Sequence, residues 1–379
     1  MGDVRILVGF LTGSYGGVEK YMMENFRILN RTKFSMDFLT SASNVPFEAE
    51  LRQAGATVFH IPSFKHPLRC YREIRKILQR RTYGCIHLNI STALLVGAAI
   101  AGRKEKVPVL VHSHSSGFND SNRKLEVLYT FLHTMCKPIL KRNTDYFGAC
   151  SLEAAAWMFP RNVVKSGEVH ILKNAIDTDK FQYDESKRRK VRKKLNIAAD
   201  TIVLGHVGNF MPVKNHSFLL EIFQAFLTLN SDARLLLLGT GELESEIKIR
   251  AQEAKLSDKI LFLGYQQNTQ DFYQAMDALV LPSLFEGFPL VAVEAQTAGL
   301  PCYLSDTITK ASALTDLVRF ISLHSSPTVW ASEINQTLHS SRYSRKEEIV
   351  DKGYSLEQEV RSLEQIYSQI IKEKENSHV

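Results

Sequence analysis

The sequence predicts an α/β protein made of two doubly wound domains, each with a parallel sheet covered by helices. Short apolar runs alternate with segments of helical length along most of the chain, which is the pattern of repeated βα units. The alternation is interrupted near residues 174–181 and restarts at Thr201. A length of 379 residues also suits two domains, at about 150 residues for each.

The first domain, residues 1–180, begins with a predicted strand, the glycine-containing loop Gly13–Gly17 and a helix over Val18–Leu29. Its apolar runs are nearly continuous, which is typical of parallel strands buried on both faces. The strands predicted in this domain are Val4–Phe10, Phe34–Leu39, Thr57–Ile61, Cys85–Leu88, Val107–His112, Asp145–Ala149 and Glu168–Leu172.

The second domain, residues 181–354, repeats this pattern after the basic stretch Lys187–Lys194, and we expect the two Rossmann-like domains to face each other across a cleft. Its predicted strands are Ile202–Val207, Arg234–Leu238, Ile260–Leu263, Ala278–Leu281, Pro301–Leu304 and Arg319–Leu323. In the last segment, residues 355–379, apolar positions recur at three- and four-residue steps over Ser355–Lys374. This spacing predicts one long helix with a buried face.

The composition is that of a soluble globular protein, with 44% hydrophobic and 23% charged residues. Its five cysteines form no Cys-x-x-Cys pair, which indicates a reducing compartment. The apolar run Ile6–Leu11 is too short for a signal peptide, and no run approaches the roughly 20 residues that span a bilayer. We therefore expect a cytoplasmic protein, at most peripheral on the inner face of the cell membrane.

The net charge of +7 suits nucleic acid, anionic lipid or phosphorylated small molecules as partners. One basic cluster lies on a single face of a predicted helix that ends at Arg80-Arg81, and it consists of Arg69, Arg72, Arg75 and Lys76. A second cluster is Lys187–Lys194. Both are interpreted as solvated helix faces or as surfaces that attract anionic lipid. Nucleic acid is disfavoured, because no binding motif is present and no aromatic residues interleave with these charges.

The sharpest motif is Glu286-Gly-Phe-Pro-Leu-Val-Ala-Val-Glu294, which directly follows a predicted strand. Pro289 suits the first turn of a helix, so Glu286 should lie in the loop and Glu294 should point inward along the helix. The N–H groups of Gly287 and Phe288 at such a helix start favour an anion. The two carboxylates could then hold sugar hydroxyls on one side and a ribose on the other; the alternative is two surface acids flanking a turn.

Three further segments are expected at strand ends. Gly208–Lys214 follows the first strand of the second domain, and Lys214 could supply a point charge to a phosphate or be solvated. Gly16-Gly17 matches neither a dinucleotide fingerprint nor a P-loop, but it could bring backbone close to a diphosphate or form a plain tight turn. His114 should project into the cleft, whereas His112 is the candidate for a buried structural histidine.

A metal site is not expected. Zinc at His112 and His114 would need further ligands, and His87 is the only evident one. The sequence Asp177-Thr-Asp179 has the form of an acidic metal motif but lies in the connection between domains.

Taken in order, these motifs resemble the family 4 retaining glycosyltransferases of GT-B fold. The resemblance covers most of the chain and is carried by Gly16–Lys20, His114, Asn174–Phe181, Gly208–Lys214, Leu263–Tyr265 and Glu286–Pro301. Residues 111–115 and 305–310 are similar to capsular and exopolysaccharide members of the family.

The resemblance implies that the C-terminal helix crosses back to the first domain and that the second domain binds a nucleotide sugar. Glu294 would bind the donor ribose, Lys214 would neutralise the diphosphate, and Tyr265 would border the base. Glu286 and His114 would act on the transferred sugar. The backbone residues implied in donor binding are Gly16, Gly17, Gly208, Asn209, Gly287, Phe288, Pro289 and Leu290.

Two departures from the family pattern stand out. Asn209 occupies a position where the family usually has Arg, which removes one positive charge beside the diphosphate. Asn174-Ala175 stands where Asn-Gly is usual, which affects the local backbone conformation.

The implied activity is a metal-independent hexosyltransferase that uses a nucleoside diphosphate sugar, with UDP the commoner nucleotide. Its expected acceptor is a glycan or a polyprenyl-diphosphate-linked sugar at an anionic membrane surface, in capsule or exopolysaccharide synthesis. No carboxylate is an evident nucleophile, so our hypothesis for retention is attack from the same face. The alternatives are a non-hydrolysing nucleotide-sugar epimerase of the same fold and a non-catalytic nucleotide-sugar-binding protein. A nicotinamide dehydrogenase would need the missing glycine fingerprint.

Overall fold

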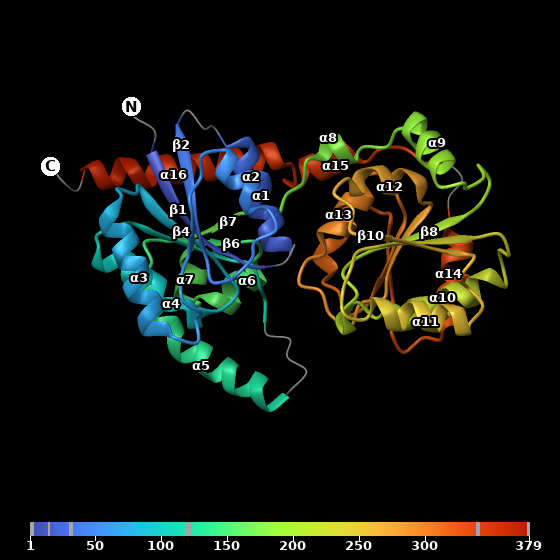
Figure 1. Ribbon diagram of the computed structural model, residues 1–379, viewed down its shortest axis with the longest axis horizontal. Helices are drawn as coiled ribbons and strands as arrows, with labels where there is room; N and C mark the ends of the chain where they lie inside the picture. Colours follow the sequence, from blue (N-terminus) through green and yellow to red (C-terminus); the bar gives the residue numbers. More distant parts are fainter. Residues whose placement is uncertain (1–3, 14–15, 30–32, 118–122, 339–341, 377–379) are drawn as a thin grey trace. The chain divides into compact units, whose positions relative to one another are not determined.

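The computed structural model describes residues 4–13, 16–29, 33–117, 123–338 and 342–376, which form two compact units (Figure 1). The first unit comprises the chain up to Ala175 together with the segment from Leu356, and the second comprises Ile176–Ser355. The division between them lies at Ala175 and Ile176, a few residues before the position expected from the sequence.

In the described part of the first unit, a seven-stranded parallel sheet has the order β3-β2-β1-β4-β5-β6-β7. Every strand predicted for this domain is present. The strands are β1 (Val4–Leu11), β2 (Phe34–Thr40), β3 (Val58–His60), β4 (Cys85–Ile90), β5 (Val109–Ser113), β6 (Tyr146–Ala149) and β7 (Val169–Ile171). The helices are α1 (Gly17–Ile28), α2 (Glu48–Gln53), α3 (Pro67–Arg80), α4 (Val96–Lys104), α5 (Arg123–Arg142), α6 (Leu152–Met158), α7 (Arg161–Ser166) and α16 (Leu356–Asn376).

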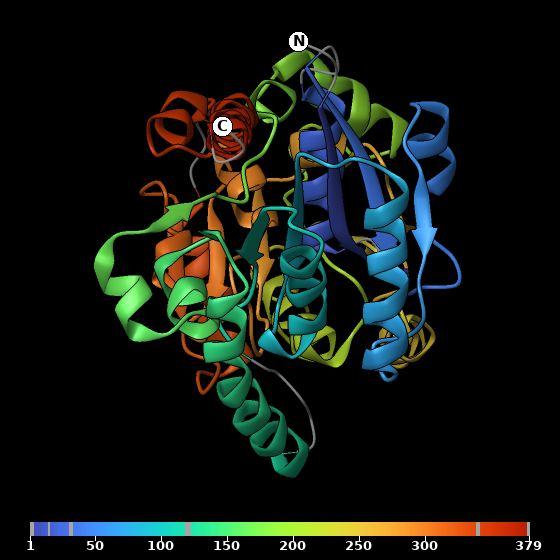
Figure 2. The same cartoon turned by 90° about the vertical axis from the view of Figure 1, so that its left-hand side faces the viewer.

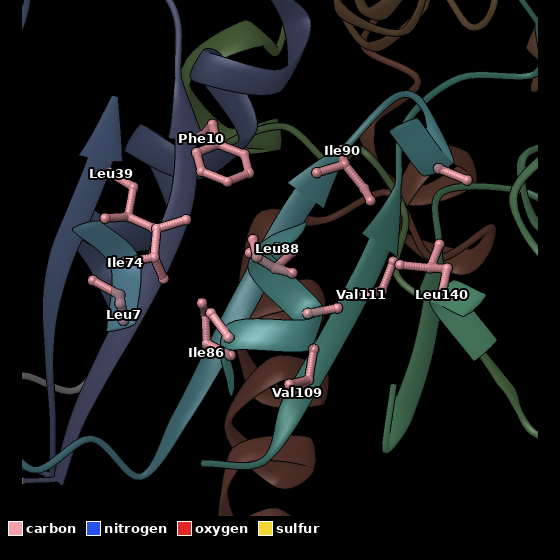
Figure 3. Close-up of a cluster of buried hydrophobic side chains, with 14 of the residues drawn as sticks. Leu7, Phe10, Leu39, Ile74, Ile86, Leu88, Ile90, Val109, Val111 and Leu140 are labelled. Atoms are coloured by element: carbon pink, nitrogen blue, oxygen red, sulfur yellow. The ribbon is translucent and has the colours of Figure 1, made fainter. Parts of the chain in front are cut away.

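The sheet of the first unit has a hydrophobic layer on each face, because successive side chains of a strand point to opposite sides. On one face, Leu7, Ile86 and Leu88 pack with residues of α3, α4, α5, α6 and α7 (Figure 3). On the other face, Ile6 and Val8 pack with α1, α2 and α16. The strands are therefore buried from both sides, as their continuous apolar runs predict.

The C-terminal helix α16 belongs to the first unit, so the predicted return of the chain to the first domain is confirmed (Figure 1). The apolar positions that predicted its buried face are all buried: Leu356, Val360, Leu363, Ile366, Tyr367 and Ile370. The helix is also tied to the sheet by polar contacts, since Tyr367 Oη lies 2.7 Å from His87 Nδ1.

In the described part of the second unit, a six-stranded parallel sheet has the order β10-β9-β8-β11-β12-β13, and each predicted strand is present. The strands are β8 (Val203–Val207), β9 (Arg234–Leu238), β10 (Ile260–Gly264), β11 (Ala278–Leu281), β12 (Cys302–Ser305) and β13 (Val318–Ile321). The longer helices are α9 (Glu185–Lys194), α10 (His216–Leu227), α11 (Glu244–Glu253), α13 (Leu290–Thr297) and α14 (Pro327–Thr337). The shorter ones are α8 (Thr178–Phe181), α12 (Thr269–Ala275), α15 (Lys346–Asp351) and the 3₁₀ turns η2 (Pro212–Lys214) and η3 (Lys310–Ser312).

The five cysteines, all within the described residues, are unpaired thiols. Among the helices of the described chain, none combines the length and the apolar character that crossing a membrane requires.

Candidate functional site

The candidate donor site of the second unit is built where β8 and β11 end. Both strands are parallel neighbours in the sheet, so their carboxyl-end loops meet at one edge. Leu284 N–H donates to the Val213 carbonyl at 2.8 Å, and the Asn215 side-chain amide donates to the Pro282 carbonyl at 3.1 Å. These two bonds join the loops next to Gly208–Lys214 and Glu286–Glu294, the segments that the sequence analysis singled out.

The central feature of this edge is an ion pair between Lys214 and Glu286. Lys214 Nζ donates to Glu286 Oε1, which also accepts from Ser283 Oγ at 3.0 Å. The side chains of Lys214 and Glu286 are 19% and 14% exposed, so the pair is largely shielded but still reachable from solvent. A cation and a carboxylate predicted to act on one ligand are thus in direct contact, and Ser283 is a partner that the sequence did not indicate.

The loop after Glu286 leads into α13 as predicted. Pro289 is the cap residue of α13, which begins at Leu290. Gly287 is exposed with open space beside it, and Phe288 stacks on Tyr354 with ring centroids 5.2 Å apart. In the described part of the chain, the N–H groups of Gly287 and Phe288 have no hydrogen-bond partner. Backbone donors at the start of a helix form a site that suits an anion or a polar hydroxyl.

Glu294 points inward from α13, which confirms the predicted orientation. It is 1% exposed, and its Oε2 accepts from the Tyr273 hydroxyl at 2.7 Å. Burial and the neighbouring carboxylate together raise the pKa of Tyr273 well above its ordinary value, so Tyr273 stays a neutral donor. The acid on the core helix therefore has a partner, as its apolar surroundings require.

Gly208 and Asn209 form a close backbone contact with the loop after β9. Phe210 N–H donates to the Thr240 carbonyl at 3.0 Å, and a side chain at Gly239 would meet the Gly208 carbonyl oxygen at 2.1 Å. Because Gly239 has φ +136°, only glycine fits there without strain. Asn209 is exposed in the same loop.

Tyr265 follows β10, and its side chain is 50% exposed. Its place at the carboxyl end of β10, beside β9, puts an aromatic ring at the same edge of the sheet as the loops already described.

In the first unit, the glycine loop ends at Gly16, which precedes α1, and Gly17 is the first residue of that helix. Glu19 is buried and binds both sides of the loop: it accepts from Thr12 N–H at 3.1 Å and from Gly16 N–H at 3.0 Å. The Gly16 N–H is therefore bound to a carboxylate, although we expected it to face a diphosphate. The spacing of Gly16 and Glu19 is that of a helix-capping pair, a signal that the sequence does contain. Ser14 and Tyr15 lie outside the described residues.

His114 follows β5 and is part of a cluster of aromatic and imidazole rings. Its Nε2 donates to Asn89 Oδ1 at 2.8 Å, because a carboxamide oxygen can only accept. His112 lies behind it with ring centroids 4.0 Å apart, and the Tyr21 ring is 5.1 Å from His114. Asn89, at the end of β4, is thus a positioning partner that the sequence analysis missed. The rule that strand ends meet at one edge would have indicated it.

The imidazoles of this cluster are neutral at pH 7. Burial lowers the pKa of His114 to about 4 and that of His87 to about 3. Burial also lowers the pKa of His112 well below its ordinary value, reinforced by its two histidine neighbours. On the far side of Tyr21, Glu359 of α16 accepts from the Tyr21 hydroxyl at 2.7 Å, and burial raises the pKa of Glu359 to about 7.

We expect the protein to lose stability as the pH falls from 6.5 towards 4. Unfolded histidines bind a proton near the ordinary pKa of 6.5, whereas the folded ones do so only near 3 to 4, so the unfolded state holds more protons in this window. Between pH 4.5 and about 7, protonation of Glu359 stabilises the folded state as the pH falls. This single group opposes the three histidines and only partly offsets their effect. The loss should be on the order of a few kcal/mol.

Thermal unfolding measured between pH 7 and pH 5 tests this expectation, which requires a falling melting temperature. The variant His114→Gln should flatten part of that dependence, while the same change at the exposed His324 should leave it intact. A melting temperature that is constant over this range would contradict the prediction.

The basic clusters are partly structural. In α9, Arg188 and Arg192 point inward and bind Asp277 with N–O distances of 2.6 Å each. In α3, Arg75 pairs with Glu105 at 2.5 Å. The interpretation of Lys187–Lys194 as a solvated or lipid-attracting face is therefore wrong for Arg188 and Arg192, since both are needed inside the second unit.

The acids of the connecting segment also have structural partners. Asp177 caps α8 by accepting from Lys180 N–H, and Asp179 pairs with Lys346. Across the described ranges, no group of three or more His, Cys, Asp and Glu side chains is arranged to hold a metal ion.

Fold and site together define a two-domain α/β protein whose second unit has a lysine–glutamate ion pair and backbone N–H groups at one edge of its sheet. Two family models match it: Glycosyltransferase Family 4 over residues 15–180 and Glycosyl transferases group 1 over residues 187–355. The chain belongs to the family 4 glycosyltransferases of GT-B fold and is related to proteins of bacterial polysaccharide synthesis.

Among curated relatives, EpsF of Bacillus subtilis, assigned as a glycosyltransferase, is 32% identical over 93% of this chain and 93% of its own length. A UDP-Gal:alpha-D-GlcNAc-diphosphoundecaprenol alpha-1,3-galactosyltransferase of Escherichia coli is 26% identical over 76% of each chain. Among solved structures, HepE of Anabaena in complex with UDP has a TM-score of 0.76 at 16% identity, with 97% of this chain and 100% of HepE covered. The glycosyltransferase WaaG, involved in lipopolysaccharide biosynthesis, has a TM-score of 0.62 at 14% identity, covering 92% of this chain and 100% of WaaG.

Proposed function

We propose that this glycosyltransferase moves a hexose from a UDP-linked donor, with retention of configuration and without a metal. The acceptor is a glycan or a polyprenyl-diphosphate-linked sugar, in bacterial capsule or exopolysaccharide synthesis. The observation that carries the proposal is the Lys214–Glu286 pair beside the unpartnered N–H groups of Gly287 and Phe288. The relatives support it, since one is named as a UDP-Gal transferase and HepE has been solved with UDP and with UDP-glucose.

Each group at this edge has a role in the proposal. Lys214 neutralises charge that develops on the departing diphosphate, and Glu286 accepts hydrogen bonds from the hydroxyls of the transferred sugar. The transferred sugar contacts backbone groups of Gly287, Phe288, Pro289 and Leu290. Glu294, which also accepts from the Tyr273 hydroxyl, binds the donor ribose. Tyr265 borders the base, and Gly208 and Asn209 let the backbone approach the donor.

The first unit is proposed to contribute His114 and the start of α1. His114 is neutral and donates its Nε2–H to Asn89, so it borders the transferred sugar without adding a charge. At the start of α1 the Gly17 N–H is the better donor to a phosphate, because the Gly16 N–H is bound by Glu19.

The proposed step is attack from the face that the diphosphate leaves. The acceptor oxygen bonds to the anomeric carbon while the bond from that carbon to the diphosphate oxygen breaks. The acceptor proton passes to the departing diphosphate, and the products are the glycoside and UDP. Glu286 is bound by Lys214 and Ser283, which suits a carboxylate that holds hydroxyls better than one that attacks carbon. A glycosyl adduct isolated on any side chain would refute this mechanism.

UDP at 100 times its dissociation constant should stabilise the protein by about 2.7 kcal/mol, because it binds only the folded state. A thermal-shift panel of UDP, GDP, ADP and NAD, each with EDTA and with Mg²⁺, measures this. Stabilisation by UDP that is equal in EDTA and in Mg²⁺ is the expected result. Stabilisation by GDP or ADP alone would mean that the donor carries that nucleotide instead of UDP. Stabilisation by UDP only with Mg²⁺ would overturn metal independence. No stabilisation by any nucleotide would favour a non-catalytic protein.

A further inference from the structure

We propose that the outward face of α5 binds to the surface of an anionic lipid bilayer. This helix carries a run of large apolar side chains that nothing in the described structure of the first unit covers. Six of them recur at three- and four-residue steps and are exposed: Val127, Leu128, Phe131, Leu132, Met135 and Ile139. Phe131 and Met135 are 61% and 60% exposed, whereas large apolar side chains of soluble proteins are normally exposed singly rather than in contiguous patches.

The apolar face is held outward by contacts on the opposite side of the helix. His133 and Leu140 are buried against the first unit, and His133 accepts from Ala93 N–H at 3.0 Å. Lys137, on the same inner side, donates to the Ala156 carbonyl at 2.9 Å. In Figure 2 the helix extends past the other helices of the first unit. The inner side thus fixes the rotation of α5 about its axis.

The charges of α5 favour an anionic partner. Between residues 124 and 142, Lys124, Lys141 and Arg142 are the basic residues besides the inward Lys137, and Glu126 is the single acid. Helix α3, which packs on α4, covers the same face of the sheet and presents the exposed side chains of Arg69, Arg72 and Arg80. An apolar helix face flanked by basic residues is the composition of helices that lie in the interface of an anionic membrane.

A bilayer fits this face better than a second copy of the chain. Because α5 carries more basic than acidic residues, two copies packed through it would bring like net charges together. A bilayer instead places the apolar side chains among acyl chains and the basic ones among phosphates.

The inference goes beyond the proposed function, because it depends on α5 alone and not on the transfer reaction. It also differs from an attachment through Lys187–Lys194, where Arg188 and Arg192 are bound inside the second unit.

The test is flotation of the full chain with vesicles of phosphatidylcholine, with and without phosphatidylglycerol, at low and high salt. We expect the protein to bind the anionic vesicles and to bind less at high salt. The double variant Phe131→Ser with Met135→Ser should weaken binding by about tenfold or more, since two buried apolar side chains are lost from the interface. Ile249→Ser is the matched control, because Ile249 is 56% exposed on α11 of the second unit and should not affect binding.

Unchanged melting temperatures of the ligand-free variants will show that folding is intact. Three results would overturn the proposal: failure of the unaltered protein to bind anionic vesicles, undiminished binding by the double variant, or equal loss with Ile249→Ser. Light scattering that finds a dimer which the double variant dissociates would assign α5 to self-association instead. Nucleotide binding is measured separately, so failure of the donor proposal cannot be confused with failure of this one.

Discussion

Replacing Lys214 with Met should lower the rate of sugar transfer by about 10² to 10³, the usual cost of removing one donor that stabilises developing negative charge. Met retains the apolar stem of the side chain while its charge is lost. The ion pair with Glu286 is lost as well, which leaves that carboxylate uncompensated beside a diphosphate of the same sign. In the proposed mechanism, both consequences raise the energy of the departing diphosphate.

The effect should be at the upper end of this range because Asn209, in the same loop as Lys214, is an amide and supplies no positive charge. Lys214 therefore carries a larger share of the charge compensation. Lys248→Met is a suitable control, since Lys248 forms an exposed ion pair with Glu244 on α11.

Release of UDP from UDP-glucose and UDP-galactose, with and without lipid-linked acceptor, measures the effect. The Lys248→Met protein should match the unaltered one. Retention of transfer within about threefold by the Lys214→Met protein would contradict the assigned role of Lys214 and direct attention to another cation.

Replacing Asp277 with Ala should lower the free energy of unfolding by about 3 to 5 kcal/mol, the cost of breaking a buried ion pair from one side. Asp277 accepts from Arg188, Arg192 and the Val203 N–H at 2.6, 2.6 and 2.7 Å. The Arg192 side chain is only 4% exposed, and burial already lowers its pKa despite the carboxylate. Without Asp277, a guanidinium would remain buried with only carbonyl partners.

Urea unfolding monitored by circular dichroism gives the free energy. The variant Glu246→Ala removes an exposed ion pair with Arg250 in the same unit and should change the free energy of unfolding by less than about 1 kcal/mol. An equally small change for Asp277→Ala would show that the arginines of α9 find other partners or reach solvent.

The strands of both sheets could be predicted because a buried parallel strand has a short apolar run as its sequence signature. This signature can be recognised without knowing which strand pairs with it. The inward orientation of Glu294 was predicted for the same reason: its apolar neighbours on one helix place it in the core. The site at the end of β8 and β11 followed from the rule that carboxyl ends of parallel strands share an edge.

Features that depend on distant contacts were not predictable in this way. The run at 187–194 gives no indication that Arg188 and Arg192 would meet Asp277, which is far along the chain. The pattern of α5 shows an apolar stripe but not that this stripe is exposed in the described structure of the first unit. The Gly16 N–H was taken as available, although Glu19 satisfies it. In each case the environment of the residue depends on which distant residue contacts it, and the residue type alone does not indicate this.

The return of α16 to the first unit has a consequence for the order of events during synthesis. The ribosome synthesises residues 176–355 before it synthesises α16, the helix that covers one face of the first sheet. The second unit can therefore reach its native state while the earlier-made unit still exposes Ile6, Val8 and their neighbours. The hydrophobic core of the first unit can be completed only after the second unit has been synthesised, and a nascent chain stalled before Leu356 would leave that face open to chaperones and proteases.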